Sequence, residues 1–111
     1  MTRHGSIIEV DPARLEEYKT LHRAVWPEVL ATLAECRIRN YSIFLRHIEG
    51  RPFLFSYFEY TGDDLAADSA RMAADPATQR WWDVCKPCHI PLPDRREGEW
   101  WAEAEEVFHM D

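Results

Sequence analysis

The chain has 111 residues, 46% of them hydrophobic and 13% aromatic, a composition that predicts one folded domain over residues 1–111 and excludes a disordered chain. Its 20 acidic and 13 basic residues give a formal charge of −7 at pH 7. Such a surface repels phosphate backbones and anionic membranes, so we expect neither a nucleic acid nor a membrane as a partner. No apolar run approaches the length of a signal peptide or a membrane span, so we expect a cytoplasmic protein.

A first strand is predicted at residues 6–10, a short stretch rich in residues that favour strands. Asp11 and Pro12 follow as a helix N-cap and a first helical residue, so we expect one long helix from there to about Cys36. The apolar stripe of this helix comprises Leu15, Tyr18, His22, Val25, Val29 and Leu33. The imidazole of His22 is therefore expected to point toward the core.

His22 is the first candidate for a functional residue. Inside a helix, Pro27 would displace the carbonyl of Arg23 and kink the helix just after His22, which would open room for a ligand; a Pro27 that begins a second helix would give the same sequence. A lone histidine on an apolar stripe is more often a hydrogen-bonded core residue than a catalyst. Tyr18 and Trp26, one turn to either side, favour the catalytic interpretation because they can orient the imidazole and offer flat surfaces to a substrate.

From Asn40 the hydrophobic period changes from 3.6 to 2, which predicts a strand with Tyr41 on one face and Phe44 on the other. A turn at residues 49–52 leads to a second strand at residues 53–60, which has apolar side chains on both faces, so the two strands should form a hairpin. One long helix can cover only one face of this hairpin. The other face is expected to meet a second subunit, and the pattern thus predicts a homodimer.

The C-terminal half is predicted to add helices and a closing strand. Aspartate caps at residues 63–64 and 75 predict helices over residues 65–74 and toward Cys85, and residues 107–110 are predicted to form the last strand. The order β-α-β-β-α-β predicts an α+β fold of the ferredoxin-like, split β-α-β kind. Such a fold has an antiparallel sheet with helices on one face.

Aromatic residues accompany His22 in this scheme. The candidates for binding a ligand are Tyr18, Trp26, Tyr41, Trp81 and Trp82. Consecutive helical residues point about 100° apart, so one indole of the Trp81-Trp82 pair can lie in the core while the other lines a cavity. A sugar would suit such a site, because its C–H faces stack on aromatic rings and its hydroxyls need a few placed polar groups. The alternative is that both indoles only pack the core.

The three cysteines, an odd number, fit a reducing compartment better than a disulfide framework. Cys85 and Cys88 form a C-x-x-C motif at the end of a predicted helix, whereas thiol redox proteins place this motif at the start of a helix, where the dipole favours a thiolate. A zinc site would need two further ligands. We therefore interpret both cysteines as incidental. The sequence also lacks a Gly-rich phosphate loop and the common hydrolase motifs, so we expect neither a metal nor a cofactor.

Four blocks of the sequence resemble the L-rhamnose mutarotase family and, taken in order, cover the chain nearly end to end. They are Tyr18-x3-His22-x3-Trp26-Pro27-Glu28, residues 40–44, residues 75–82 and residues 105–108. The resemblance implies a dimeric α/β-barrel assembly that interconverts the α and β anomers of L-rhamnose, a reaction of the aldose 1-epimerase type. It also implies that His22 is the proton donor and that the sugar contacts Tyr18, Tyr41, Trp81 and Trp82.

The chemistry of anomer exchange agrees with this resemblance. Opening a pyranose requires a proton at the ring oxygen and the loss of one from the anomeric hydroxyl, and it needs no metal or cofactor. We hypothesise that His22 protonates the ring oxygen, while Tyr18, Tyr41 or a bound water handles the anomeric proton. Relatives that act on L-fucose share His-x3-Trp-Pro-Glu, whereas residues 40–43 favour L-rhamnose. Two other functions stay open: a cofactorless dimeric α/β-barrel monooxygenase, and a sugar-binding module without catalysis.

Overall fold

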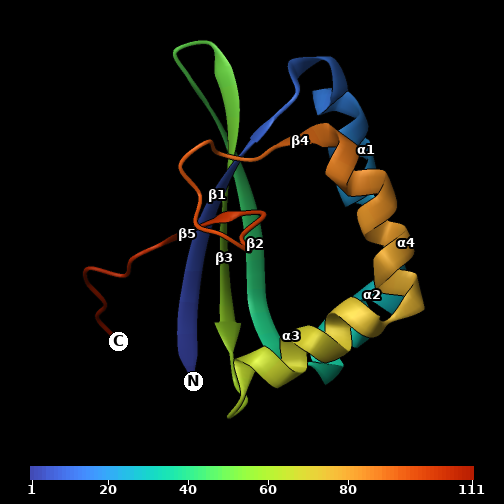
Figure 1. Ribbon diagram of the computed structural model, residues 1–111, viewed down its shortest axis with the longest axis vertical. Coiled ribbons are helices and arrows are strands. Elements are labelled where there is room, and N and C mark those ends of the chain that lie inside the picture. Colours follow the sequence, from blue (N-terminus) through green and yellow to red (C-terminus); the bar gives the residue numbers. More distant parts are fainter.

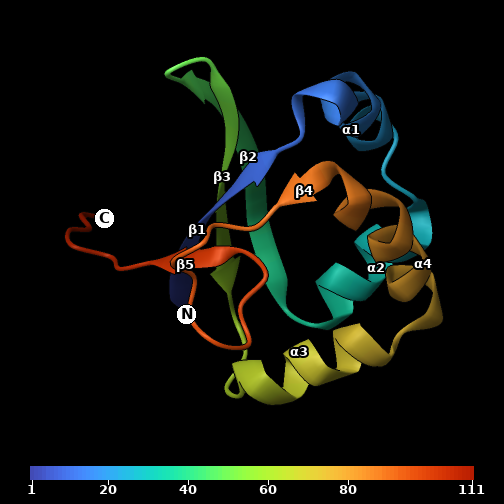
Figure 2. The same ribbon diagram turned by 45° about the horizontal axis from the view of Figure 1, so that its top comes forward.

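A curled antiparallel sheet carries a layer of helices on one side in the computed structural model, which describes residues 1–111 (Figure 1). The strands are β1 (Thr2–Val10), β2 (Ile38–Ile48), β3 (Arg51–Tyr60), β4 (His89–Ile90) and β5 (Ala102–Ala104). The helices are α1 (Leu15–Arg23), α2 (Pro27–Glu35), α3 (Leu65–Ala74) and α4 (Pro76–Cys85), with short 3-10 turns at Pro12–Arg14 and Lys86–Cys88. The sheet order is β2-β3-β1-β4, and β5 also pairs with β1. The predicted α+β class, with helices on one face, is confirmed (Figure 2).

Aspartate side chains cap the two C-terminal helices. The Asp64 carboxylate accepts a hydrogen bond from the backbone N–H of Ala67 at 3.1 Å, and Asp75 accepts one from the N–H of Thr78 at 2.9 Å. Each cap satisfies a donor that the first turn of a helix leaves free. The predicted starts of α3 and α4 are therefore confirmed. None of the helices is both long enough and apolar enough to cross a membrane.

The prediction of one long helix from Asp11 to Cys36 is wrong, because two helices occupy this stretch. The first, α1, ends at Arg23, and the second, α2, begins at Pro27. Between them, Trp26 adopts an extended conformation with ψ of 132°. The residue before a proline avoids the helical region, and proline itself fits the first helical position. Pro27 thus begins a second helix, which leaves His22 in the last turn of α1.

The β2–β3 hairpin closes as predicted, but β2 contains a bulge that the sequence pattern did not reveal. Arg39 pairs with Glu59 and Ser42 pairs with Tyr57, so two residues of β2 stand opposite a single residue of β3. One of the two, Asn40, has a positive φ of 49°. Because one extra residue reverses the alternation of side chains, strand residues before and after the bulge can face the same side of the sheet.

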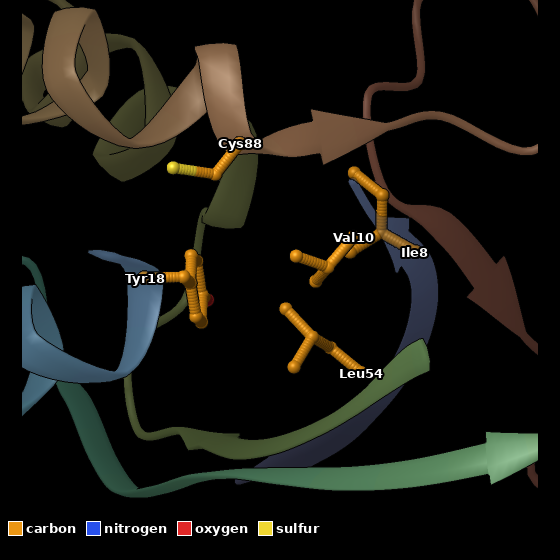
Figure 3. Packing of buried hydrophobic residues seen from close by; sticks show 5 residues of the cluster. All are labelled: Ile8, Val10, Tyr18, Leu54 and Cys88. Carbon is orange, nitrogen blue, oxygen red and sulfur yellow. The ribbon is translucent and has the colours of Figure 1, made fainter. Parts of the chain in front are cut away.

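The core lies between the sheet and the helices. Its main cluster joins Tyr18 of α1 to Ile8, Val10, Leu54 and Cys88, and Figure 3 shows the phenol ring directed from its helix toward the three strand residues. All five side chains are almost fully buried. A second cluster of Val29, Trp81 and Cys85 packs α2 against α4. Together the two clusters hold α1, α2 and α4 over the concave face of the sheet.

The opposite face of the sheet carries no helix (Figures 1 and 2). Ile43 and Leu45 of β2 pack against the core, so strand alternation directs Phe44 and Ile48 to this outer face, where they are 62% and 45% exposed. The predicted closing strand at residues 107–110 is wrong, since β5 ends at Ala104 and the tail beyond it forms no strand. A strand requires a hydrogen-bonding partner, whatever its residue preferences. The tail instead extends away from the sheet on the side opposite the helices (Figure 1).

Candidate functional site

His22 is held by its own helix. Its Nδ1 lies 2.9 Å from the backbone oxygen of Tyr18, one turn earlier. A carbonyl oxygen can only accept, so Nδ1 carries the proton and Nε2 is left free for other partners. Burial lowers the pKa of His22 below the ordinary value of 6.5, although the bond to the Tyr18 carbonyl partly opposes this effect. At pH 7 the imidazole is therefore mainly neutral, with a lone pair on Nε2.

Aromatic rings surround the imidazole. The Tyr18 ring stacks on His22 with centroids 4.0 Å apart and planes 23° apart, as the four-residue spacing on α1 allows. Trp81 of α4 approaches His22 at 5.3 Å between centroids. Trp26 lies beyond Trp81, at 5.1 Å and edge to face. The predicted spacing on one helix thus places Tyr18, and tertiary packing adds an indole that is far away in the sequence.

A cavity of about 290 Å³ opens beside His22, and we call it the His22 cavity. Its lining comprises His22, Val25, Val29, Leu30, Leu33, Tyr41, Ile43 and Trp81. Tyr18 borders a neighbouring hollow of about 260 Å³, which His22 and Ile43 also line. These volumes are close to the roughly 300 Å³ at which small-molecule sites begin. His22 is thus neither sealed in hydrocarbon nor directed to open solvent.

Tyr41 faces the helices from β2. Its ring lies 5.6 Å from that of Phe58 between centroids, and it borders the His22 cavity. Tyr41 is 43% exposed, and burial of its phenol hydroxyl, together with the nearby Cys85 thiol, raises the pKa of Tyr41 to about 12. Burial also raises the pKa of Tyr18 well above its usual range. Both phenols are therefore protonated at neutral pH and can donate hydrogen bonds.

A second cavity of about 330 Å³ adjoins the first, and we call it the His89 cavity. It shares Tyr41 and Trp81 with the His22 cavity. Its remaining polar and aromatic lining includes Trp82, Lys86, His89, Trp100 and Trp101. Although it is the larger of the two, neither His22 nor Tyr18 borders it, so the smaller cavity is the one that brings His22 together with Tyr41 and Trp81.

The structure therefore separates the predicted site residues into groups. His22, Tyr41 and Trp81 meet at the His22 cavity, Tyr18 supports the imidazole, and Trp82 borders the His89 cavity. Trp26 lines neither cavity but backs Trp81.

Sequence reasoning missed His89 and the pair Trp100-Trp101. A second tandem of tryptophans, noticed as the first one was, would have been the signal for this part of the site.

The cysteines do not form a reactive site. All three are buried and unpaired. Burial raises the pKa of Cys85 to about 12, and burial with a nearby Glu17 carboxylate raises that of Cys88 to about 11. Thiols that stay protonated are poor nucleophiles, which agrees with the interpretation of both as packing residues. No cluster of three His, Cys, Asp or Glu side chains is arranged to hold a metal ion.

The fold and the site together define an α+β protein of the dimeric α/β-barrel type, with a histidine beside an aromatic-lined cavity. Residues 3–110 match the sequence profile of L-rhamnose mutarotase, and the chain belongs to the L-rhamnose mutarotase family. The resemblance in the four blocks is thereby confirmed.

Relatives of full length agree with this assignment. The chain is 33% identical to an L-rhamnose mutarotase of Oceanobacillus iheyensis and 37% identical to one of Bacillus subtilis, with all of both chains covered in each case. The crystal structure of an L-rhamnose mutarotase from Formosa agariphila matches with a TM-score of 0.75 at 25% identity, over the whole of both chains. A tetracenomycin F2 cyclase of Streptomyces glaucescens matches with a TM-score of 0.71 at 18% identity, over all of this chain and 98% of the other, and shows likeness of fold alone.

Proposed function

We propose that this protein interconverts the α and β anomers of L-rhamnose and that His22 carries the proton. Membership of the L-rhamnose mutarotase family supports the reaction. The role of His22 is supported by its geometry. The imidazole borders the His22 cavity, its Nδ1 is bound to the Tyr18 carbonyl, and its Nε2 is free. L-fucose, which differs from L-rhamnose only in the configuration of its hydroxyls, is the sugar against which the preference must be measured.

The reaction needs two proton transfers in each direction. As the ring opens, the bond from C1 to the ring oxygen breaks, the anomeric hydroxyl loses its proton and becomes the aldehyde oxygen, and the ring oxygen gains a proton. Rotation about the C1–C2 bond turns the aldehyde, and closure by the reverse steps gives the other anomer. No atom or electron is gained or lost overall. The protein must therefore supply one group that takes a proton and one that gives it.

His22 suits this exchange because its neutral form can take a proton on Nε2 and its protonated form can return it. The expected role as donor to the ring oxygen belongs to the protonated form. Tyr41, whose pKa is raised to about 12, is protonated at neutral pH, so it can hydrogen-bond the anomeric oxygen while a bound water takes up the anomeric proton. Since Tyr41 and His22 line the same cavity and Tyr18 does not, the geometry favours Tyr41 as the partner and Tyr18 as the support of the imidazole.

The apolar part of the site fits a deoxy sugar. Trp81 borders both cavities, so its indole can stack against the C–H face of a pyranose, and Trp26 holds that indole from behind. Trp82 borders the adjoining cavity, where it can contact the far side of the sugar. The few polar groups available, at His22 and Tyr41, match the small number of hydrogen bonds that orient such a ligand.

The proposal extends to a homodimer in the cytoplasm. The outer face of the sheet carries exposed Phe44 and Ile48 and has no helix over it. The C-terminal tail extends on the same side (Figure 1), and its residues Val107 and Phe108 are 87% and 80% exposed. An apolar face together with an apolar tail is the surface that a second copy of the chain would cover. Three free cysteines agree with a reducing compartment.

The test of the reaction is saturation-transfer NMR between the anomeric proton signals of L-rhamnose, with L-fucose measured in parallel. The wild-type protein should accelerate exchange, and His22→Ala should lose about 100-fold or more of that acceleration, as expected for a general acid–base group. His47→Ala, at an exposed histidine of β2, is the matched control and should behave as wild type. Full acceleration by His22→Ala would refute the role of His22. If the wild type bound the sugar without accelerating exchange, the protein would be a sugar-binding module without catalysis.

A further inference from the structure

His89 has one nitrogen with a fixed partner and one with none. The indole Nε1–H of Trp100 donates to Nδ1 of His89 at 3.0 Å. An indole nitrogen can only donate, so Nδ1 bears no proton, and the neutral imidazole must carry its proton on Nε2. That Nε2 exposes less than 1 Å² and has no hydrogen-bond partner. No other buried side-chain nitrogen or oxygen of the protein lacks a hydrogen-bond partner.

An unpartnered donor of this kind requires an explanation. Leaving a buried N–H unsatisfied destabilises a fold by about 1–3 kcal/mol, and native proteins satisfy the large majority of such groups. The Trp100 indole accounts for an acceptor at Nδ1 of His89, but no group in the core accounts for the second nitrogen, Nε2. The nitrogen is explained if it serves a ligand that enters the adjoining cavity.

The surroundings of His89 are those of a binding surface. Its ring lies 5.4 Å from Tyr18 and 5.5 Å from Trp101 between centroids, and all of Trp101, Trp100 and His89 border the His89 cavity. Lys86 Nζ lies 5.1 Å from the ring centres of both Trp82 and Trp100, which holds these indoles in relation to each other. His89 is thus set among rings that a sugar can stack against.

The ionisation state also fits a donor. Burial, together with the nearby His22 and Lys86, lowers the pKa of His89 to about 4. The other titratable groups close to it, the Tyr18 phenol and the Cys85 and Cys88 thiols, have raised pKa values and are uncharged at neutral pH. His89 therefore keeps one proton throughout the neutral range, and it neither takes up nor releases a proton as His22 does.

We propose that His89 is a substrate-positioning residue, whose Nε2–H donates a hydrogen bond to a hydroxyl oxygen of the sugar. This inference rests on the proposed mutarotase function, and it assigns the sugar a second anchor beside Tyr18, in addition to His22. Because Nε2 is enclosed in the free protein, the sugar reaches it when a neighbouring ring shifts. Trp101 is suited to this movement, since it precedes β5 at the end of a segment that contains no helix or strand after β4.

Three substitutions separate the donor from the packing of the ring. His89→Phe keeps a planar ring and loses both nitrogens, His89→Asn keeps an acceptor near Nδ1 for Trp100, and His89→Gln can present an amide N–H near the position of Nε2. We expect KM for L-rhamnose to rise about tenfold in the Phe and Asn variants, with kcat nearly unchanged, because one hydrogen bond to a bound hydroxyl is lost. The Gln variant should restore KM to within about threefold of wild type.

A second measurement does not depend on the variants. In ¹⁵N-labelled wild-type protein, long-range ¹H–¹⁵N spectra should show His89 as the neutral Nε2–H tautomer, and saturating L-rhamnose should shift its Nε2 and the attached proton. An Nε2–H signal that L-rhamnose leaves unmoved would overturn the inference and would indicate that this N–H rests against an aromatic ring. So would an unchanged KM in a folded His89→Phe variant.

The two proposals can fail separately. If the wild type binds L-rhamnose, moves the His89 signal and does not accelerate anomer exchange, the mutarotase function fails while His89 remains a sugar contact. If the wild type accelerates exchange and neither KM nor the His89 signal responds, the function stands and the role of His89 is refuted.

Discussion

Acidification should destabilise the fold through His89, before most carboxylates titrate. In the unfolded chain this histidine takes up a proton near pH 6.5, whereas in the fold its pKa is about 4. Between these values the unfolded state binds more protons, so the free energy of unfolding is at its full value above pH 6.5 and falls as the pH drops toward 4. His22, whose pKa is also lowered by burial, contributes in the same direction.

The size of the effect follows from the two pKa values of His89. They differ by about 2.5, and each pKa unit corresponds to about 1.4 kcal/mol, which gives about 3 kcal/mol in total. Because the side chain is only half-buried, contact with water reduces the expected loss to about 2 kcal/mol between pH 7 and pH 4.5. Glu9 and Asp75 have lowered pKa values as well, so their contributions are lost mainly below this window.

The assay is urea unfolding followed by tryptophan fluorescence at several pH values from 7 to 4.5. His89→Phe should remove about 2 kcal/mol of the decrease seen in the wild type, whatever its stability at pH 7. His47→Phe, at an exposed histidine, should leave the decrease unchanged. Equal dependence on pH in the wild type and in His89→Phe would refute the claim that the fold holds this imidazole neutral.

Three further outcomes follow from the core, the outer face and the aromatic wall. Leu54→Ala should lower the free energy of unfolding by about 2–5 kcal/mol in urea, while Leu30→Ala, at a residue 52% exposed, should change it by no more than about 0.5 kcal/mol. Phe44→Asp should convert a dimer to a monomer in sedimentation at micromolar concentration, and Val84→Asp on the helical side should not; a monomeric wild type would refute the interface. Trp81→Leu should raise KM for L-rhamnose about tenfold at an unchanged fold by circular dichroism, and a wild-type KM would return this indole to packing alone.

The local features of the fold could be predicted from the sequence because their causes are local. The caps at Asp64 and Asp75 and the alternation of the β2–β3 hairpin depend on a few neighbouring residues, and each is present. The effect of Pro27 could not be predicted in the same way, because a proline can either kink one helix or begin a second one, and the sequence is the same in both cases. The closing strand at residues 107–110 failed because strand formation depends on a partner, and the preferences of the residues do not supply one.

The candidate site was predictable in the part that lies on one helix. Four-residue spacing on α1 brought Tyr18 onto His22, and the resemblance to a family added Tyr41 and Trp81. The contact between Trp100 and His89 joins residues 11 apart through an irregular segment, so no periodicity indicates it. Which tautomer a histidine adopts depends on such partners, and it became visible only with the geometry.

The bulge in β2 has a consequence for how this site can change. Because Asn40 and Tyr41 together stand opposite one residue of β3, deleting Ser42 would restore regular pairing with Asn40 opposite Phe58 and Tyr41 opposite Tyr57, which turns Tyr41 away from the helices if Ile38 and Ile43 keep their places. The phenol would then be absent from the cavity in a protein that still contains every other side chain of the site. The deletion of one residue, with no change in any remaining side chain, would thus remove the Tyr41 phenol from the lining of the cavity.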